Sequence, residues 1–266
     1  DPLDSENIHW NCFEQTKPWL HIKFSPTLKI MDTSDESKAL IVEKLLRLIQ
    51  KEKPELKISG NDFRFDIDFQ RNYGFGTSST FISLLSQWSG VNAYLLLEKS
   101  FGGSGFDIAA ATQKSLFVYQ ANGQSSHSLR KITPINMTTG ITEKILFVYT
   151  GRKQESLTQI LSFKDTPTSQ EQICEMNAIV HEVSKCESIE NFEALMNRSE
   201  KLLSNILNLE RVSEALFPGY PFAIKSLGAW GGDFMMATFR DEAVARDYFH
   251  KKGMKPIFSY AQLIHS

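Results

Sequence analysis

Hydrophobic and polar residues alternate without a break in the segment DFRFDIDFQ, residues 62–70. This period of two predicts a half-buried strand, because successive side chains of a strand point to opposite faces. Its polar face carries Asp66 and Asp68, which resemble a paired-carboxylate site. A solvated strand face is the better interpretation of these two residues. The apolar face consists of Phe63, Phe65, Ile67 and Phe69.

The same reading along the chain predicts a mixture of strands and helices. Partial alternation predicts strands within residues 8–31, and helical spacing predicts a helix at 35–52, capped by Asp35 or Ser34. Because the elements do not alternate as steady βαβ units, we expect the α+β class. The further predicted helices are 77–89, 92–99, 154–163, 168–186, 189–209 and 241–251, and the further strands are 115–120, 144–151 and 256–260.

The chain has 266 residues, enough for one large domain or two small ones. Beyond residue 151 the pattern becomes mostly helical, and polar residues surround Pro167. We therefore expect two domains, residues 1–153 and 154–266. The sequence begins DPLDSE without a methionine, so we expect the first domain to lack upstream residues.

Composition narrows the class of protein. The net charge of −2 gives no electrostatic argument for a nucleic-acid partner or an anionic membrane. No apolar run approaches the roughly 18 residues typical of a membrane span, and the N-terminus does not resemble a signal peptide. The three cysteines, Cys12, Cys174 and Cys186, are widely spaced, which argues against a disulfide framework or a zinc site and favours the cytoplasm.

The segment NYGFGTSST, residues 72–80, places two glycines and four hydroxyl residues directly before a predicted helix. A helix N-terminus offers unpaired N–H groups and about half a unit of positive charge. Glycine lets the backbone approach a ligand closely, and the hydroxyls add donors. The segment is therefore either a capped turn or a phosphate-binding site; it matches neither the Walker nor the Rossmann pattern. The residues concerned are Gly74, Gly76, Thr77, Ser78 and Ser79.

A second glycine-rich segment, FGGSGFDIAAAT at residues 101–112, places Asp107 among small residues. A carboxylate in such surroundings can orient a substrate hydroxyl and take its proton during phosphoryl transfer. The alternative is an aspartate that caps a helix. Glu98 lies nine residues earlier, where an ordinary surface residue of a helix is the favoured interpretation.

A third glycine-rich segment, KSLGAWGGDF at residues 225–234, contains Gly228, Gly231 and Gly232. These glycines permit a tight approach of the backbone to a ligand. A loop that only connects two strands would use the same residues, so both interpretations remain open.

The order of the three segments resembles the motifs of the GHMP kinase superfamily, which includes galactokinase, homoserine kinase, mevalonate kinase and phosphomevalonate kinase. GFGTSS resembles the second motif of that family, and KSLGAWGGD resembles the third. GSGFDIAAA, residues 103–111, and the terminal Asp233 of the third segment are similar to phosphomevalonate kinases and to a bacterial group with a GxDIA sequence. YTGRKQES, residues 149–156, resembles a stretch near the substrate in those enzymes.

The resemblance implies a two-lobed α+β fold, with a first lobe like domain 2 of ribosomal protein S5, a ferredoxin-like second lobe, and ATP between them. It implies Asp107 as the catalytic carboxylate, and Ser78 with Glu98 as Mg²⁺ ligands. It assigns phosphate binding to Gly74, Gly76, Thr77, Ser78 and Ser79, and a loop over the phosphate and substrate to Gly228, Ala229, Gly231 and Gly232.

The chain departs from the family pattern at three points. Nothing in it matches the first motif, which supplies a lysine and a glutamate near the N-terminus. Leu227 replaces the usual serine or threonine of the third motif, and Trp230 replaces a glycine. An indole at position 230 would crowd the loop, stack on a ligand or pack in the core.

The resemblance favours an ATP-dependent kinase whose acceptor is mevalonate or phosphomevalonate, with a sugar or an amino-alcohol as the alternative acceptor. The departures favour a second hypothesis, a non-catalytic protein that binds a nucleotide or metabolite on the same fold. A structural or partner-binding domain without a ligand is the third. For the first hypothesis the partners are ATP, Mg²⁺ and a small-molecule substrate, and the chain is a monomer or a homodimer.

Overall fold

A computed structural model describes residues 6–123, 125–151, 166–228 and 233–264. The chain forms two compact units. Unit 1 comprises residues 1–71, 75–113 and 119–132, and unit 2 comprises residues 72–74, 114–118 and 133–266. Unit 2 thus also contains the roughly twenty residues that precede the expected boundary at 153, because the strand at 145–149 pairs within the sheet of unit 2.

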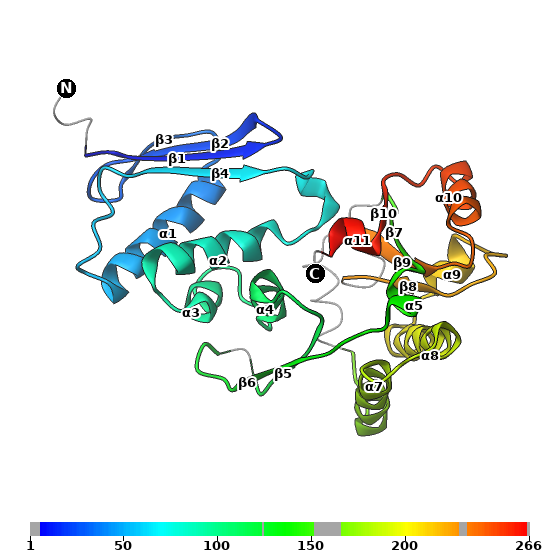
Figure 1. The fold of residues 1–266 in the computed structure, drawn as a ribbon. Coiled ribbons are helices and arrows are strands. Elements are labelled where there is room, and N and C mark those ends of the chain that lie inside the picture. Colours follow the sequence, from blue (N-terminus) through cyan, green and yellow to red (C-terminus); the bar gives the residue numbers. More distant parts are fainter. Residues whose placement is uncertain (1–5, 124, 152–165, 229–232, 265–266) are drawn as a thin grey trace. The chain divides into compact units, whose positions relative to one another are not determined.

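Unit 1 is built on a four-stranded sheet with the order β3-β2-β1-β4. Neighbours β1–β2 and β2–β3 are antiparallel, whereas β1 and β4 are parallel and are connected through β2, β3 and helix α1. Helices α1 and α2 cover one face of this sheet (Figure 1). The elements are β1 (Ile8–Glu14), β2 (Lys17–Phe24), β3 (Ile30–Thr33), α1 (Glu36–Glu52) and β4 (Asp62–Ile67).

The core of unit 1 follows from the predicted periodicities. Trp10 of β1 is fully buried, and its ring centroid lies 4.6 Å from that of Phe65 and 5.5 Å from that of Phe81. Asp35 caps α1 by accepting a hydrogen bond from the Lys38 backbone N–H at 3.0 Å. The apolar face of α1 consists of Ala39, Val42, Leu45, Leu46 and Ile49.

The alternating strand predicted at 62–70 is β4, which ends at Ile67. On its exposed face Arg64 binds the carboxylate of Asp66 through two hydrogen bonds of 2.7 and 2.9 Å. Asp66 is therefore paired with a guanidinium rather than with a second carboxylate. This pairing is what a solvated strand face requires.

The rest of unit 1 consists mainly of short helices. The predicted helix at 77–89 is α2 with the same bounds, Thr77–Ser89. Helix α4, by contrast, lies inside the glycine-rich segment for which no helix was predicted. The ribbon β5–β6 contributes residues to both units. The elements that follow β4 are η1 (Arg71–Tyr73), whose last two residues belong to unit 2, α2, α3 (Ala93–Glu98), α4 (Phe106–Thr112), β5 (Phe117–Ala121) and β6 (Arg130–Pro134).

Unit 2 has an antiparallel sheet with the order β10-β7-β9-β8. Its elements follow one another as β7, helices, β8, β9, α10 and β10, which is the βαββαβ arrangement of a ferredoxin-like unit. They are α5 (Thr139–Thr142), β7 (Ile145–Tyr149), α7 (Gln170–Val183), α8 (Ile189–Leu207), α9 (Val212–Ala215), β8 (Ile224–Ser226), β9 (Phe234–Thr238), α10 (Glu242–Lys251), β10 (Ile257–Ser259) and α11 (Tyr260–Leu263).

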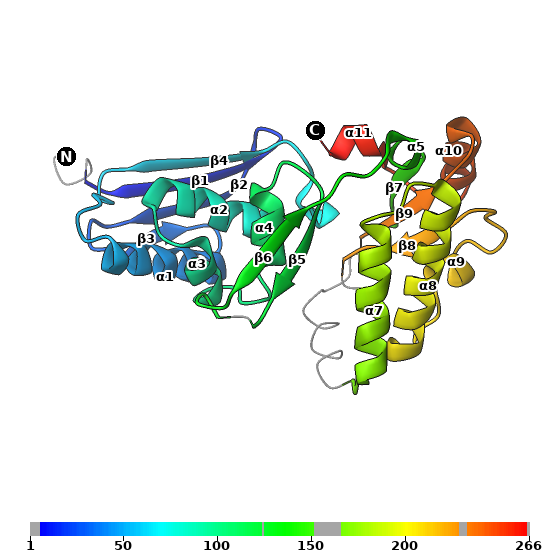
Figure 2. The ribbon, with the colours of Figure 1, turned by 60° about the horizontal axis from the view of Figure 1, so that its bottom comes forward.

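Helices cover both faces of the sheet of unit 2. Leu146 and Val148 of β7 belong to a buried cluster with Phe249 of α10, whereas Ile145 belongs to a second cluster with Phe192 of α8. Alternate residues of one strand thus reach the two clusters. Figures 1 and 2 show α8 and α10 on opposite sides of the sheet.

The predicted helix at 154–163 lies outside the described residues. Within the described part of the chain, no helix combines the length and the apolar composition that crossing a membrane requires.

Candidate active site

The start of α2 has the features of an anion-binding helix end. Gly76 is its N-cap in a left-handed conformation, with φ of +74°, and no described side chain caps the helix. The first backbone bond of the helix is that from Thr80 N–H to the Gly76 carbonyl. The N–H groups of Thr77, Ser78 and Ser79 therefore have no partner inside the helix.

The hydroxyls of this turn have different roles. Ser79 is buried, and its Oγ donates to the Gly76 carbonyl at 2.7 Å, so this hydroxyl holds the turn together. Ser78 is exposed and Thr77 is half-buried. Ser78 is consequently the hydroxyl most available to an external ligand.

Asp107 lies in the first turn of α4, a helix that packs against α2 within unit 1. As in α2, a left-handed glycine is the N-cap, here Gly105 with φ of +83°, and no described side chain caps the helix. Partial loss of hydration raises the pKa of the Asp107 carboxyl above its ordinary value, although the residue remains exposed. A raised pKa makes this carboxylate a better proton acceptor.

An aromatic wall fixes the turn before Asp107. A Cβ built on Gly105 would lie 2.8 Å from the ring of Tyr94 and 3.1 Å from Oη of Tyr119, so only glycine fits there. Tyr119 Oη donates to the Ser104 carbonyl at 2.8 Å and accepts from Arg130 Nε at 3.2 Å. Sequence reasoning missed this support, because the tyrosines and the arginine come from separate elements without a shared motif.

Both carboxylate oxygens of Glu98 accept hydrogen bonds from the protein. Its Oε1 accepts from Lys99 Nζ at 2.9 Å, and its Oε2 accepts from the Ser126 backbone N–H at 2.6 Å. These contacts, that with Lys99 first, lower the pKa of Glu98 to about 2. Among the described residues, no group of three or more His, Cys, Asp or Glu side chains could hold a metal ion. The Mg²⁺ role of Ser78 and that of Glu98 both stay predictions.

In unit 2, residues from three segments singled out in the sequence lie close together. Gly74 has a φ of +69°, and a Cβ on it would lie 2.3 Å from Oδ2 of Asp233, at the end of the third glycine-rich segment. The Asp233 carbonyl accepts from Thr150 N–H at 2.8 Å and from Thr150 Oγ1 at 3.2 Å. Tyr149 Oη donates to the Asn72 carbonyl at 3.4 Å.

Aromatic contacts stabilise this junction of unit 2. The ring centroid of Tyr73 lies 5.1 Å from that of Tyr149, 5.9 Å from that of Phe234 and 6.4 Å from that of Phe258. The four rings tie Asn72–Gly74 to strands β7, β9 and β10. No sequence pattern indicated this cluster, since Tyr149, Phe234 and Phe258 are ordinary strand aromatics and Tyr73 belongs to the short helix η1.

The described residues of the third segment lie at the end of β8 and at the start of β9. Leu227 N–H donates to the Phe234 carbonyl at 3.1 Å, which continues the ladder beyond Ser226. Gly228 has a φ of +68°, and no atom of the described residues lies within 4 Å of a Cβ built on it, so its conformation favours glycine. Ala229, Trp230, Gly231 and Gly232 lie outside the described residues.

The fold agrees with solved structures. A phosphomevalonate kinase from Streptococcus pneumoniae in complex with phosphomevalonate and AMPPNP matches with a TM-score of 0.69 and 13% identity, over 94% of this chain and 87% of that chain. The mevalonate kinase of Methanococcus jannaschii matches with a TM-score of 0.64 and 15% identity, over 96% of this chain and 84% of that chain. L. major mevalonate kinase in complex with R-mevalonate matches with a TM-score of 0.56 and 18% identity, over 84% of this chain and 76% of that chain.

No family model matches the sequence, and no curated protein matches it either. The similarity is therefore one of fold, carried by structures that share fewer than one residue in five with this chain. It agrees with the fold that the three sequence motifs predicted. The chain has the two-lobed α+β fold of the GHMP kinases, to whose mevalonate and phosphomevalonate members it is structurally similar.

Proposed function

We propose that this protein is an ATP-dependent kinase that transfers the γ-phosphoryl group to a small molecule. The observation that carries the proposal is in unit 1. An uncapped, glycine-started helix with an exposed hydroxyl packs against a second helix that carries Asp107, a carboxylate of raised pKa, in its first turn. The first element suits a phosphate and the second suits proton transfer.

In the proposed reaction, the N–H groups at the start of α2 bind phosphate oxygens of ATP, with the hydroxyls of Thr77 and Ser78 as further donors. For an acceptor with a hydroxyl group, Asp107 orients the hydroxyl and takes its proton. The acceptor oxygen forms a bond to the γ-phosphorus, the bond from that phosphorus to the bridging oxygen breaks, and ADP leaves. An acceptor phosphate would need only orientation, because it carries no proton to be removed at neutral pH.

Mevalonate or phosphomevalonate is the acceptor class that we propose first, because the two mevalonate kinases and the phosphomevalonate kinase named above share the fold. A sugar or an amino-alcohol is the alternative. An ATP-consumption screen over these acceptors tests the choice. The proposed setting is the cytoplasm, where ATP is abundant and cysteines stay reduced.

Binding of Mg·ATP is expected to raise the melting temperature by several degrees. A ligand at 100 times its dissociation constant stabilises the folded state by about 2.7 kcal/mol, and each kcal/mol shifts a chain of this size by about 2–4 °C. Differential scanning fluorimetry measures the shift, with MgCl₂ alone as the control. No shift up to millimolar Mg·ATP would contradict nucleotide binding and favour a domain without this ligand.

A non-catalytic protein that binds a nucleotide is the second candidate, and Leu227 supports it. This residue lacks the hydroxyl of the family's third motif, and its backbone N–H is already bonded to Phe234. A thermal shift with Mg·ATP, combined with no ATP consumption on any acceptor in the screen, would favour this candidate over the kinase.

Replacing Glu98 by glutamine tests its predicted role toward Mg²⁺. If Glu98 is a ligand, the Mg²⁺ concentration for half-maximal activity is expected to rise several-fold, since a neutral amide is a weaker ligand for this hard cation. A magnesium titration at fixed ATP measures it, with Glu171→Gln, an exposed carboxylate in the first turn of α7, as the control. An unchanged requirement would leave Glu98 only its bonds to Lys99 and Ser126.

A further inference from the structure

Two carboxylates of α8 hold the β8–β9 hairpin of unit 2. Glu193 and Glu200 are seven residues apart, which places them on the same side of the helix about two turns from each other. Glu193 contacts the end of the hairpin that lies away from the third glycine-rich segment, and Glu200 contacts the end that leads into it. The two contacts differ in their partners.

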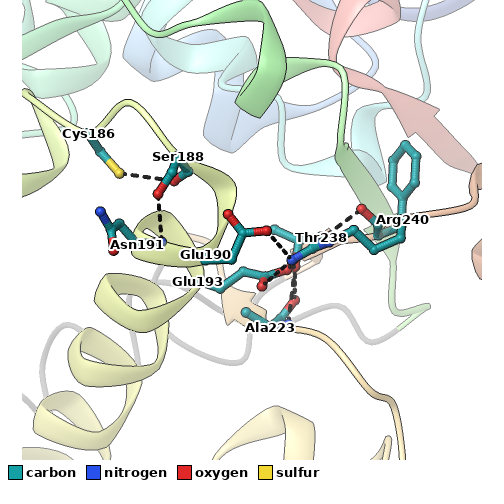
Figure 3. A network of polar contacts seen from close by, with 9 residues as sticks. Cys186, Ser188, Glu190, Asn191, Glu193, Ala223, Thr238 and Arg240 are labelled. Carbon is teal, nitrogen blue, oxygen red and sulfur yellow. Dashed lines mark hydrogen bonds and ion pairs between the residues drawn. The ribbon is translucent and has the colours of Figure 1, made fainter.

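Glu193 forms the structural contact of the pair. Its carboxylate accepts from Thr238 Oγ1 at 2.5 Å and from both terminal nitrogens of Arg240, at 2.8 and 2.9 Å (Figure 3). Thr238 Oγ1 in turn accepts from Ala223 N–H at 3.1 Å. Burial would raise the pKa of Glu193, but the bonds from Arg240 and Thr238 outweigh it and lower the pKa. This contact joins α8 to both strands of the hairpin at its base.

Glu200 is the more deeply buried of the two, with only 1% of its surface exposed. Its Oε1 lies 3.3 Å from Lys225 Nζ, and its Oε2 accepts from Ser226 Oγ at 3.3 Å. Lys225 Nζ also donates to Ser199 Oγ at 3.1 Å. Lys225 and Ser226 are the last two residues of β8, directly before Leu227 and Gly228.

Stability alone does not account for a charge at this position. Removing a carboxylate from water costs free energy, and replacing a buried ion pair by apolar residues is often neutral or stabilising. Glu193 and the apolar residues Phe192, Leu195 and Met196 already hold α8 against the rest of unit 2. Glu200 in addition restricts the orientation of the end of β8, since its two carboxylate oxygens bind the successive residues Lys225 and Ser226.

We propose that Glu200 is a positioning residue, which sets the end of β8, and thereby Gly228, through Lys225 and Ser226. The inference rests on the proposed kinase function and on the role that the family resemblance implies for Gly228, at the start of a loop over the phosphate and substrate. Glu200 is not in contact with substrate in this proposal. It acts through Lys225 and Ser226.

The test compares Glu200→Gln with Glu193→Gln. For Glu200→Gln we expect kcat to fall about tenfold or more while KM for ATP changes less than threefold, and backbone hydrogen exchange of residues 226–228 to become faster. For Glu193→Gln we expect the melting temperature to fall by as much as in Glu200→Gln or more, with kcat within about twofold of wild type. An equal loss of kcat in the two variants would overturn the proposal, since it would reflect general loosening of the hairpin.

The double variant Glu200→Met/Lys225→Met separates positioning from charge satisfaction. It removes both charges, so the melting temperature is expected to recover while kcat stays low. Recovery of both would show that the pair only satisfies its own charges. Hydrogen exchange keeps the two proposals apart: if wild type transfers no phosphate, the kinase function fails, and unchanged exchange at 226–228 in Glu200→Gln overturns the positioning role independently.

Discussion

Replacing Asp107 by asparagine is expected to lower kcat about 10²–10⁴-fold on an acceptor with a hydroxyl group. Removal of a positioned general base typically costs this much, equivalent to about 3–5.5 kcal/mol of barrier. Asparagine keeps the size of the side chain and its place in the first turn of α4, but it cannot take a proton. Steady-state kinetics with the acceptor found in the screen measures the loss.

Folding defects can be distinguished from this effect by the sign of the pKa shift. The folded state raises the pKa of Asp107, so the ionised carboxylate is less favourable in the folded protein than in the unfolded chain. The resulting destabilisation is absent at low pH and develops as the pH rises through the unfolded and then the folded pKa. At neutral pH the asparagine variant is therefore expected to be at least as stable as wild type.

The same shift predicts the acid limb of the pH–rate profile. Asp107 must be ionised to accept a proton, so kcat/KM, which reports the free enzyme, is expected to fall as the pH drops through its raised pKa, above the ordinary aspartate value of about 3.9. Glu171→Gln is the matched control, since it neutralises an exposed carboxylate in the first turn of α7. Full turnover by Asp107→Asn would show that the carboxylate has no part in proton transfer.

Local signals in the sequence were enough to predict the start of α2. A glycine at each end and an unbroken apolar period between them define residues 77–89, and the structure has the same bounds. Helix α4 was missed because it has only seven residues and begins inside a glycine-rich segment. About two turns of helix are too short for a helical period of apolar residues to be recognised. The resemblance nevertheless singled out Asp107, since it depends on residue order rather than on secondary structure.

Long-range pairing is what the sequence could not supply. The boundary expected at 153 differs from the division in the structure because β7 pairs with β9, a strand almost ninety residues later. Glu200 resembles any polar residue of an amphipathic helix, and only the packing of α8 on β8 places it beside Lys225. Arg130 likewise acquires its role only where β6 meets Tyr119. Each of these depends on tertiary contacts between residues without a shared local pattern.

Replacing Gly74 by alanine is expected to lower kcat/KM for ATP about 10–100-fold and to destabilise unit 2. Two costs combine at this position. A φ of +69° costs a residue with a Cβ roughly 1–2 kcal/mol, and the Cβ itself would lie 2.3 Å from Oδ2 of Asp233. The Asp233 main chain is held by the bonds from Thr150 to its carbonyl, so relief of the collision requires the Asp233 side chain to rotate away from Gly74. Gly74 also begins the GFGTSS segment, so its displacement moves the backbone that leads to Gly76.

Gly219→Ala separates the two costs. Gly219 also lies in unit 2 and has a φ of +87°, but within the described part of the chain no atom lies within 4 Å of a Cβ built on it, so this variant carries the backbone cost alone. The difference in melting temperature between the two variants then measures the collision with Asp233. In a double-mutant cycle, Asp233→Ala is expected to restore part of the stability of Gly74→Ala, because it removes the atom that the new Cβ meets. Additive effects of the two substitutions would contradict the contact, and with it the convergence of the second and third sequence motifs on which the placement of Gly74 depends.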